Sequence, residues 1–139
     1  MSPKQQTVTY WTTTGLVAFA FLSGGLMDLS GSPAVVAGMQ SLGYPAYVAT
    51  ILGAWKVLGA VALLAPRFPR LKEWAYAGVV FDLTGAAASH AFVGDPTAKI
   101  VTPLVILGLA AASWALRPGA RRLGAGIPAV APRPVAQPA

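Results

Sequence analysis

Four long apolar segments occupy most of the chain and constrain its fold more than any other feature. They cover residues 10–29, 46–65, 74–93 and 100–116. Each approaches the roughly 20 helical residues needed to cross a hydrocarbon core about 30 Å thick. Only 10 % of the residues are charged and 55 % are hydrophobic, whereas about 25 % are charged in soluble domains. The sequence therefore predicts an all-α, polytopic membrane protein with one four-transmembrane-helix bundle over residues 1–117.

The first apolar segment allows a second interpretation. A basic start followed by an apolar run is also typical of a secretory signal peptide, whose hydrophobic region is about 7–15 residues long. Here the apolar run continues to Leu29. Its length favours a retained membrane span.

The basic residues predict how the bundle is oriented. Only Lys99 falls in a connection on one side of the four spans, and eight basic residues share the other side: Lys4, Arg67, Arg70, Lys72, Arg117, Arg121, Arg122 and Arg133. Loops rich in Lys and Arg stay in the cytoplasm, so both termini are expected there. This distribution also explains the net charge of +6, and no nucleic-acid partner is expected. Residues 118–139 are rich in proline and are expected to form a disordered cytoplasmic tail.

The connection between the first two spans is long and carries no Lys or Arg. Val35, Val36, Met39 and Leu42 recur in it at helical spacing. This pattern predicts a short helix lying on the outer interface. A simple spacer folded back on the bundle is the alternative.

Two opposite charges lie in the middle of apolar segments, Lys56 in the second and Asp82 in the third. The helical rise places both at roughly the same depth, near the bilayer centre. An unpaired charge there costs about 2.5–3.5 kcal/mol on insertion scales. We therefore expect Lys56 and Asp82 to form an ion pair inside the bundle.

Small residues follow the same helical stripes as these charges and would let the helices approach closely. They are Ala49, Gly53 and Ala60 beside Lys56, and Gly78, Gly85 and Ser89 beside Asp82. One interpretation is that the pair only fixes how the helices pack. The other is that it lines a polar pocket that binds an anionic or quinone-like head group, or relays a proton.

A second polar layer is expected near the outer surface, where Asp28 ends the first span and His90 ends the third. The two side chains lie at heights that would let them meet. A solvated interfacial histidine is the simpler interpretation of His90. With one histidine and no cysteine in the chain, no metal site, bis-histidine haem or disulfide is expected within one chain.

Several segments of the chain resemble the DoxX-like family of small bacterial integral membrane proteins. The resemblance rests on the segments 42–47, 51–59, 69–78 and 81–86, followed by Ser89 and His90, and it extends from about Tyr10 to Pro118. It implies a four-helix membrane bundle in the bacterial inner membrane. It also implies an association with sulfur or oxidative-stress redox complexes, because the family takes its name from a membrane subunit associated with thiosulfate:quinone oxidoreductase.

Together these observations predict an accessory or assembly subunit of a membrane complex, and a redox-linked complex is one candidate. Such a subunit would not be catalytic on its own and would contact the bilayer and a membrane or redox protein. A quinone-binding oxidoreductase subunit that uses Lys56 and Asp82 is the alternative, and quinone is the one cofactor under consideration. A solute or proton transporter is less favoured, because one chain of four short helices offers little room for alternating access. A homo-oligomer would offer more.

Overall fold

The computed structural model of the protein describes residues 1–124 and is all-helical within that range. Its elements are α1 (Pro3–Leu29), α2 (Pro33–Ser41), α3 (Tyr47–Leu64), α4 (Pro69–Phe92), α5 (Thr97–Ala115) and the short 3-10 helix η1 (Gly119–Arg121). The predicted all-α class is confirmed.

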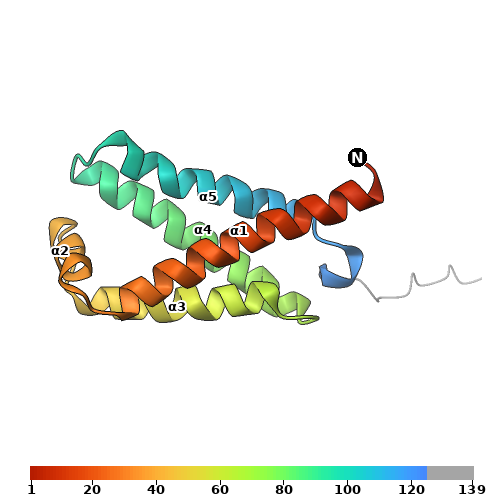
Figure 1. Cartoon of the computed structure of the whole chain (residues 1–139), viewed down its shortest axis with the longest axis horizontal. Helices are drawn as coiled ribbons and strands as arrows, with labels where there is room; N and C mark the ends of the chain where they lie inside the picture. Colours follow the sequence, from red (N-terminus) through yellow and green to blue (C-terminus); the bar gives the residue numbers. More distant parts are fainter. Residues whose placement is uncertain (125–139) are drawn as a thin grey trace, which may run out of the picture.

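The four long helices form one bundle, in which each helix packs against two others (Figure 1). Helix α1 packs against α3 and α5, and α4 packs against the same two helices. The half of the bundle toward the N-terminus and η1 is filled by buried side chains, among them Tyr10, Leu63 and Lys72. Toward the opposite end the α1–α3 pair diverges from the α4–α5 pair, and α2 lies there beside α3. The bundle is therefore tight at one end and open at the other.

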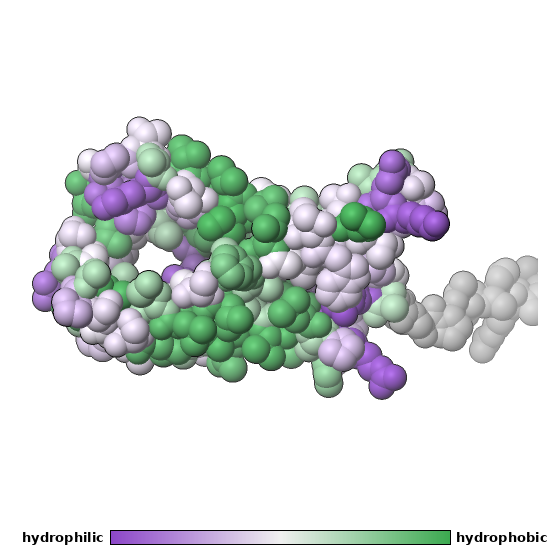
Figure 2. Space-filling model, in the orientation of Figure 1, coloured by the Kyte–Doolittle hydropathy of each residue, from purple (hydrophilic) through white to green (hydrophobic). Residues whose placement is uncertain are grey.

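Three of the long helices, α1, α3 and α5, are long and apolar enough to cross a membrane. Helix α4 is not among them, because Asp82 and His90 interrupt its apolar sequence and its first turns carry Arg70, Lys72 and Glu73. Large apolar side chains are nevertheless exposed along α4, including Trp74 and Phe81. Figure 2 shows the surface as a broad hydrophobic band between two more hydrophilic ends.

Two helices, α1 and α4, begin five or more residues before the corresponding apolar segments, and the residues at their first turns explain why. Helix α1 starts at Pro3, because Ser2 and Gln5 form a capping box that satisfies its first amides. Helix α4 starts at Pro69, whose ring suits the first helical turn.

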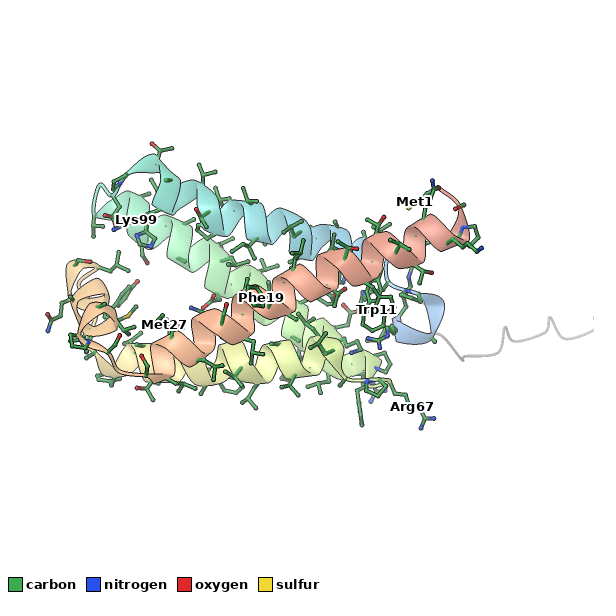
Figure 3. All side chains as sticks on the ribbon, viewed as in Figure 1. Met1, Trp11, Phe19, Met27, Arg67 and Lys99 are labelled. Atoms are coloured by element: carbon green, nitrogen blue, oxygen red, sulfur yellow. The ribbon has the colours of Figure 1, made fainter. Side chains whose placement is uncertain are left out.

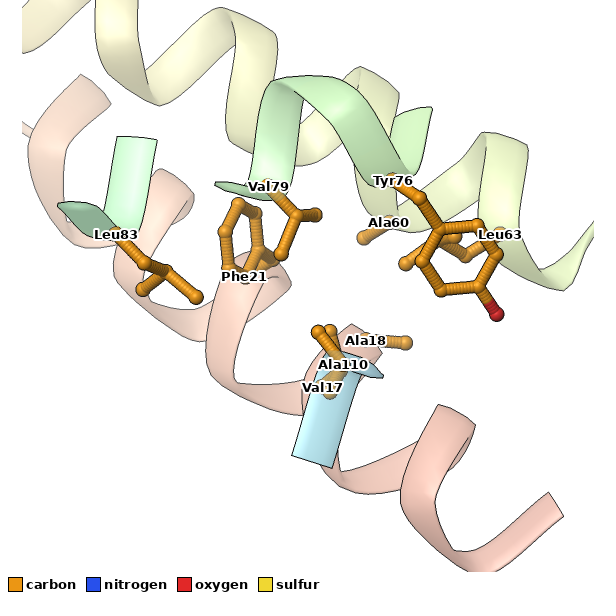
Figure 4. Close-up of a cluster of buried hydrophobic side chains, with 9 residues drawn as sticks. All are labelled: Val17, Ala18, Phe21, Ala60, Leu63, Tyr76, Val79, Leu83 and Ala110. Carbon is orange, nitrogen blue, oxygen red and sulfur yellow. The ribbon is translucent and has the colours of Figure 1, made fainter. Parts of the chain in front are cut away.

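The apolar core joins all four long helices near the middle of the bundle (Figure 4). It consists of Val17, Ala18 and Phe21 from α1, Ala60 and Leu63 from α3, Tyr76, Val79 and Leu83 from α4, and Ala110 from α5.

The inward face of α4 differs from the predicted stripe. Gly78 and Gly85 are exposed and have no atom near the position of an added Cβ. The face that packs inward carries Tyr76, Val79 and Leu83, so α4 is rotated by about one residue from the expected orientation. The three larger side chains fill the interior of the bundle, and van der Waals packing of this kind drives the association of helices in lipid.

The turn between α3 and α4 is tight and held by a buried lysine. Arg67 and Phe68 adopt left-handed backbone angles, with φ of 63° and 53°, a conformation that costs of order 1–3 kcal/mol per residue. Lys72 is fully buried, and its Nζ donates hydrogen bonds to the carbonyls of Ala62 at 2.8 Å, Leu63 at 2.9 Å and Ala65. One ammonium thereby satisfies three carbonyls at the end of α3.

The connections outside the bundle also show order. Helix α2 confirms the short helix predicted between the first two spans, and Gly43 ends that region with a φ of 80°. Residues 118–124, expected to be part of a disordered tail, instead turn back over the tight end through η1. Arg121 holds them there by donating to Tyr10 Oη at 3.2 Å and lying over the Trp11 ring. The rest of the expected tail, residues 125–139, lies outside the described residues.

Candidate functional site

Three charged side chains from three helices meet inside the open half of the bundle. Lys56 Nζ on α3 lies 2.9 Å from Asp28 Oδ2 on α1 and 4.0 Å from Asp82 Oδ2 on α4. All three side chains are only 15 to 23 % exposed. The structure thus brings Lys56 and Asp82 together, as the depth argument predicted. Asp28, expected in the outer polar layer, is nevertheless the closer partner of Lys56.

Two glycines create the helix crossing that brings Asp28 to Lys56. A Cβ added to Gly25 would lie 2.8 Å from the Gly53 carbonyl oxygen, and a Cβ added to Gly53 would lie 2.8 Å from that of Gly25. Distances this short are not tolerated, so α1 and α3 approach this closely only because both residues are glycine. Asp28 and Lys56 each lie three residues beyond one of these glycines. The crossing therefore fixes the ion pair.

A pocket of about 430 Å³ opens beside this cluster, between the two helix pairs. Lys56 and Asp82 line it together with the apolar side chains of Phe21, Leu83 and Ile106. Figure 2 shows an opening in this half of the molecule with hydrophilic surface at its edge, and Figure 3 shows Lys99 and Met27 on opposite sides of it. The volume falls within the range of small-ligand sites.

Helix α5 contributes a proline to the pocket wall. Pro103 lies inside the helix and is buried, yet it lines the pocket. A proline within a helix removes one backbone hydrogen bond and bends the helix. The helical ladder of α5 is therefore interrupted beside the pocket.

A second polar group lines the same pocket nearer the open end. His90 Nδ1 lies 2.7 Å from Asp95 Oδ2, and Lys99 Nζ donates to Asp95 Oδ1 at 3.1 Å. The His90 and Lys99 side chains both line the pocket. Asp95 does not line it, but its carboxylate bonds to both side chains. The hydrogen bond with His90, followed by that from Lys99, lowers the pKa of Asp95, so this carboxylate is ionised at neutral pH.

The expected meeting of Asp28 and His90 does not occur. Each residue has an opposite partner of its own, Lys56 for Asp28 and Asp95 for His90. Asp95 and Lys99 were missed as site residues because both lie in the turn and first helical turn outside the apolar segments. Their signal in the sequence was the spacing His90, Asp95, Lys99, which places an acid within reach of two bases around one turn.

The tight end of the bundle contains a separate polar network. The Ser113 hydroxyl lies 2.6 Å from Thr14 Oγ1 and 2.7 Å from Tyr76 Oη, and all three residues are buried. Below it Arg117 forms an ion pair with Glu73 at 2.8 Å and lies over the ring of Tyr76. The three hydroxyls pair with one another and Arg117 pairs its charge with Glu73, although the buried Arg117 Nη1 has no hydrogen-bond partner within the described residues. We assign these groups to packing.

Burial of Lys72 at the tight end disfavours the charged form of its side chain. Burial lowers the pKa of Lys72 to about 8, and the nearby Arg121 and Arg117 add repulsion. The side chain is still mostly protonated at pH 7, which matches its role as a donor to three carbonyls.

Within residues 1–124 no cluster of three or more His, Asp or Glu side chains is arranged to hold a metal ion. The chemistry available in the pocket is that of two ammonium groups, Lys56 and Lys99, one carboxylate and one histidine. These groups can bind polar atoms of a ligand and exchange protons with them.

Comparison with known proteins gives one match. A model described as the DoxX-like family matches residues 12–113, which include the Lys56 cluster and the pocket. Neither a curated protein nor a solved structure matches the chain.

Proposed function

The chain belongs to the DoxX-like family, and from this premise we propose that it is an integral membrane subunit whose pocket binds a quinone or quinol. The observation that carries the proposal is the position of Asp82. Lys56 is already paired with Asp28 at 2.9 Å, and within the described residues no hydrogen bond reaches the Asp82 carboxylate. Asp82 faces the pocket with its acceptor capacity unused.

The pocket suits a ligand with oxygen atoms on an apolar ring. The Lys56 ammonium has three N–H donors, one of which serves Asp28, so it can also donate to a carbonyl oxygen. Asp82 can accept from a hydroxyl. Phe21, Leu83 and Ile106 supply apolar walls for a ring and its tail. A pair that served only to fix helix packing would need no such pocket beside it.

We place all four long helices across the inner membrane of a bacterium, with both termini in the cytoplasm. The support is that the basic residues gather at the tight end, where Lys72, Arg117 and Arg121 lie. Trp74 and Trp114 lie at the same end, as expected of side chains at a membrane interface. The pocket then opens toward the outer side.

An accessory or assembly role in a redox-linked membrane complex is the second candidate function. It is favoured by the absence of cysteine from the sequence, because electrons exchanged with a bound quinone would have to pass to a cofactor or another protein. The two candidates are compatible, since a quinone-binding subunit can serve a complex that contains the electron carrier.

Equilibrium binding of decylubiquinol, whose hydroxyls can donate to Asp82, to the full chain in lipid nanodiscs tests the first candidate. Empty nanodiscs correct for quinol dissolved in lipid. We expect saturable binding that Asp82→Asn weakens at least ten-fold, because the amide keeps the shape of the side chain but loses its charge. Thr84→Val is the matched control, since Thr84 lies on the same helix and is exposed, with its hydroxyl bonded to its own backbone.

Binding that is absent, or equal in wild type and Asp82→Asn, would refute the quinone site. Stoichiometric co-purification of another membrane protein without bound quinone would then support the accessory role. Proton flux into liposomes that Asp82→Asn abolishes would instead support a transporter.

A further inference from the structure

His90 lines the pocket nearer to its open end than Lys56 and Asp82 do. It lies eight residues after Asp82 on α4, which is about 12 Å along the helix. Ala86, midway between them, also lines the pocket. Asp82, Ala86 and His90 therefore form one continuous wall from the charged cluster toward the open end.

The orientation of the His90 ring is fixed by its partner. Nδ1 lies 2.7 Å from Asp95 Oδ2, and an ionised carboxylate can only accept a hydrogen bond. Nδ1 must therefore carry a proton. In the neutral ring the lone pair then lies on Nε2, which makes no hydrogen bond to any other residue in the range 1–124.

The surrounding charges suit a proton-exchanging group. One oxygen of the Asp95 carboxylate lies 2.7 Å from His90 Nδ1, and Lys99 on α5 donates to the other at 3.1 Å. Deeper in the pocket stand Lys56 and Asp82. A pocket of about 430 Å³ also has room for several waters, since each water takes about 30 Å³.

We infer that His90, oriented by Asp95, is the group through which the pocket exchanges protons with the outer aqueous side. This inference rests on the proposed function. When a ligand hydroxyl or a pocket water gives up a proton, an O–H bond breaks and an N–H bond forms at Nε2. The imidazolium then releases the same proton to water at the open end, which restores the original tautomer.

The single histidine of the chain allows a direct test by nuclear magnetic resonance. We would label the full chain with ¹⁵N-histidine in nanodiscs and record the ring nitrogens at about pH 8, where unperturbed histidine is neutral. The expected spectrum is that of the Nδ1–H tautomer, and Asp95→Asn should abolish this preference. An Nε2–H tautomer in the wild type would overturn the inference.

A binding experiment tests the exchange itself, with decylubiquinol as the probe. We expect its affinity to fall at least ten-fold between about pH 8 and pH 5, the range in which histidine titrates, because a protonated Nε2 no longer accepts from the hydroxyl. His90→Gln should remove this dependence, and Thr84→Val should keep it. Binding that stays independent of pH, or that keeps its pH dependence in His90→Gln, overturns the inference alone. Absence of quinol binding to the wild type overturns the proposed function and the inference with it.

Discussion

Asp28, at the C-terminal end of α1, is the nearest acidic partner of Lys56 on α3, with 2.9 Å between Oδ2 and Nζ against 4.0 Å for Asp82. The carboxylate that pairs most closely with Lys56 and the carboxylate that faces the pocket therefore belong to different residues, Asp28 and Asp82. This separation lets the packing role and the binding role be tested with different variants.

Lys56→Met should destabilise the bundle by about 3 kcal/mol, because it leaves two carboxylates without their cation. Lys56→Met combined with Asp28→Asn should regain more of that stability than Lys56→Met combined with Asp82→Asn. Thermal or denaturant unfolding in detergent measures the three variants. An equal rescue by the two asparagines would contradict the assignment of Asp28 as the main partner.

Gly25→Ala and Gly53→Ala should each destabilise the bundle by about 1–3 kcal/mol, the usual cost of overpacking. Each added methyl group would lie 2.8 Å from a backbone oxygen of the opposite helix, so α1 and α3 would have to separate. Gly24→Ala is the control, because no atom lies within 4 Å of its added Cβ. The same unfolding assay compares them, and equal losses at Gly24 and Gly25 would show that the crossing is not close.

Lys72→Met should destabilise the protein by about 3 kcal/mol, because three carbonyls at the end of α3 lose a buried donor. Arg70→Met, an exposed position two residues earlier on α4, should change the free energy of unfolding by less than about 0.5 kcal/mol. If both variants unfold alike, Lys72 does not cap α3 in the membrane.

Acid should loosen the turn between α4 and α5. The pKa of Asp95 is lowered by its hydrogen bonds with His90 and Lys99, so its contribution to stability is fully present above about pH 4 and is lost as the pH falls through the lowered value. Amide hydrogen exchange in residues 93–97, corrected for the intrinsic effect of pH, should therefore accelerate in acid. Asp95→Asn should exchange fast already at neutral pH, and a wild-type turn that is equally protected at pH 2 and pH 7 would refute this role.

The sequence predicted the helices better than the partners of their charges. Hydrophobic length is a property of each segment, and it located α1, α3, α4 and α5 within a few residues, except at the start of α1, which a capping box extends, and the start of α4 at Pro69. The depth of Lys56 and Asp82 also follows from counting residues along a helix. Both predictions need only the helical rise.

The rotation of α4 and the choice of Asp28 could not be predicted in the same way, because both depend on how pairs of helices cross. Gly78 and Gly85 offered small residues on one stripe, but burial of Tyr76, Val79 and Leu83 determined the face. Asp28 reaches Lys56 only because Gly25 and Gly53 let α1 and α3 touch. The sequence shows these glycines but not which helix each one meets.

The orientation of the bundle can be tested with single cysteines, because the chain has none of its own. Two cysteines would be placed at exposed positions of the tight end, by Phe68→Cys and Gly119→Cys. Two others would be placed at exposed positions of the open end, by Ser41→Cys and Thr97→Cys. Basic loops are retained in the cytoplasm, so we expect a membrane-impermeant maleimide to label only the second pair in spheroplasts and only the first pair in inverted vesicles. None of the four substitutions removes a basic residue, so the topological signal is unchanged. The reverse labelling pattern would place the pocket, with His90 and Asp95, on the cytoplasmic side and would reverse the direction of proton exchange inferred above.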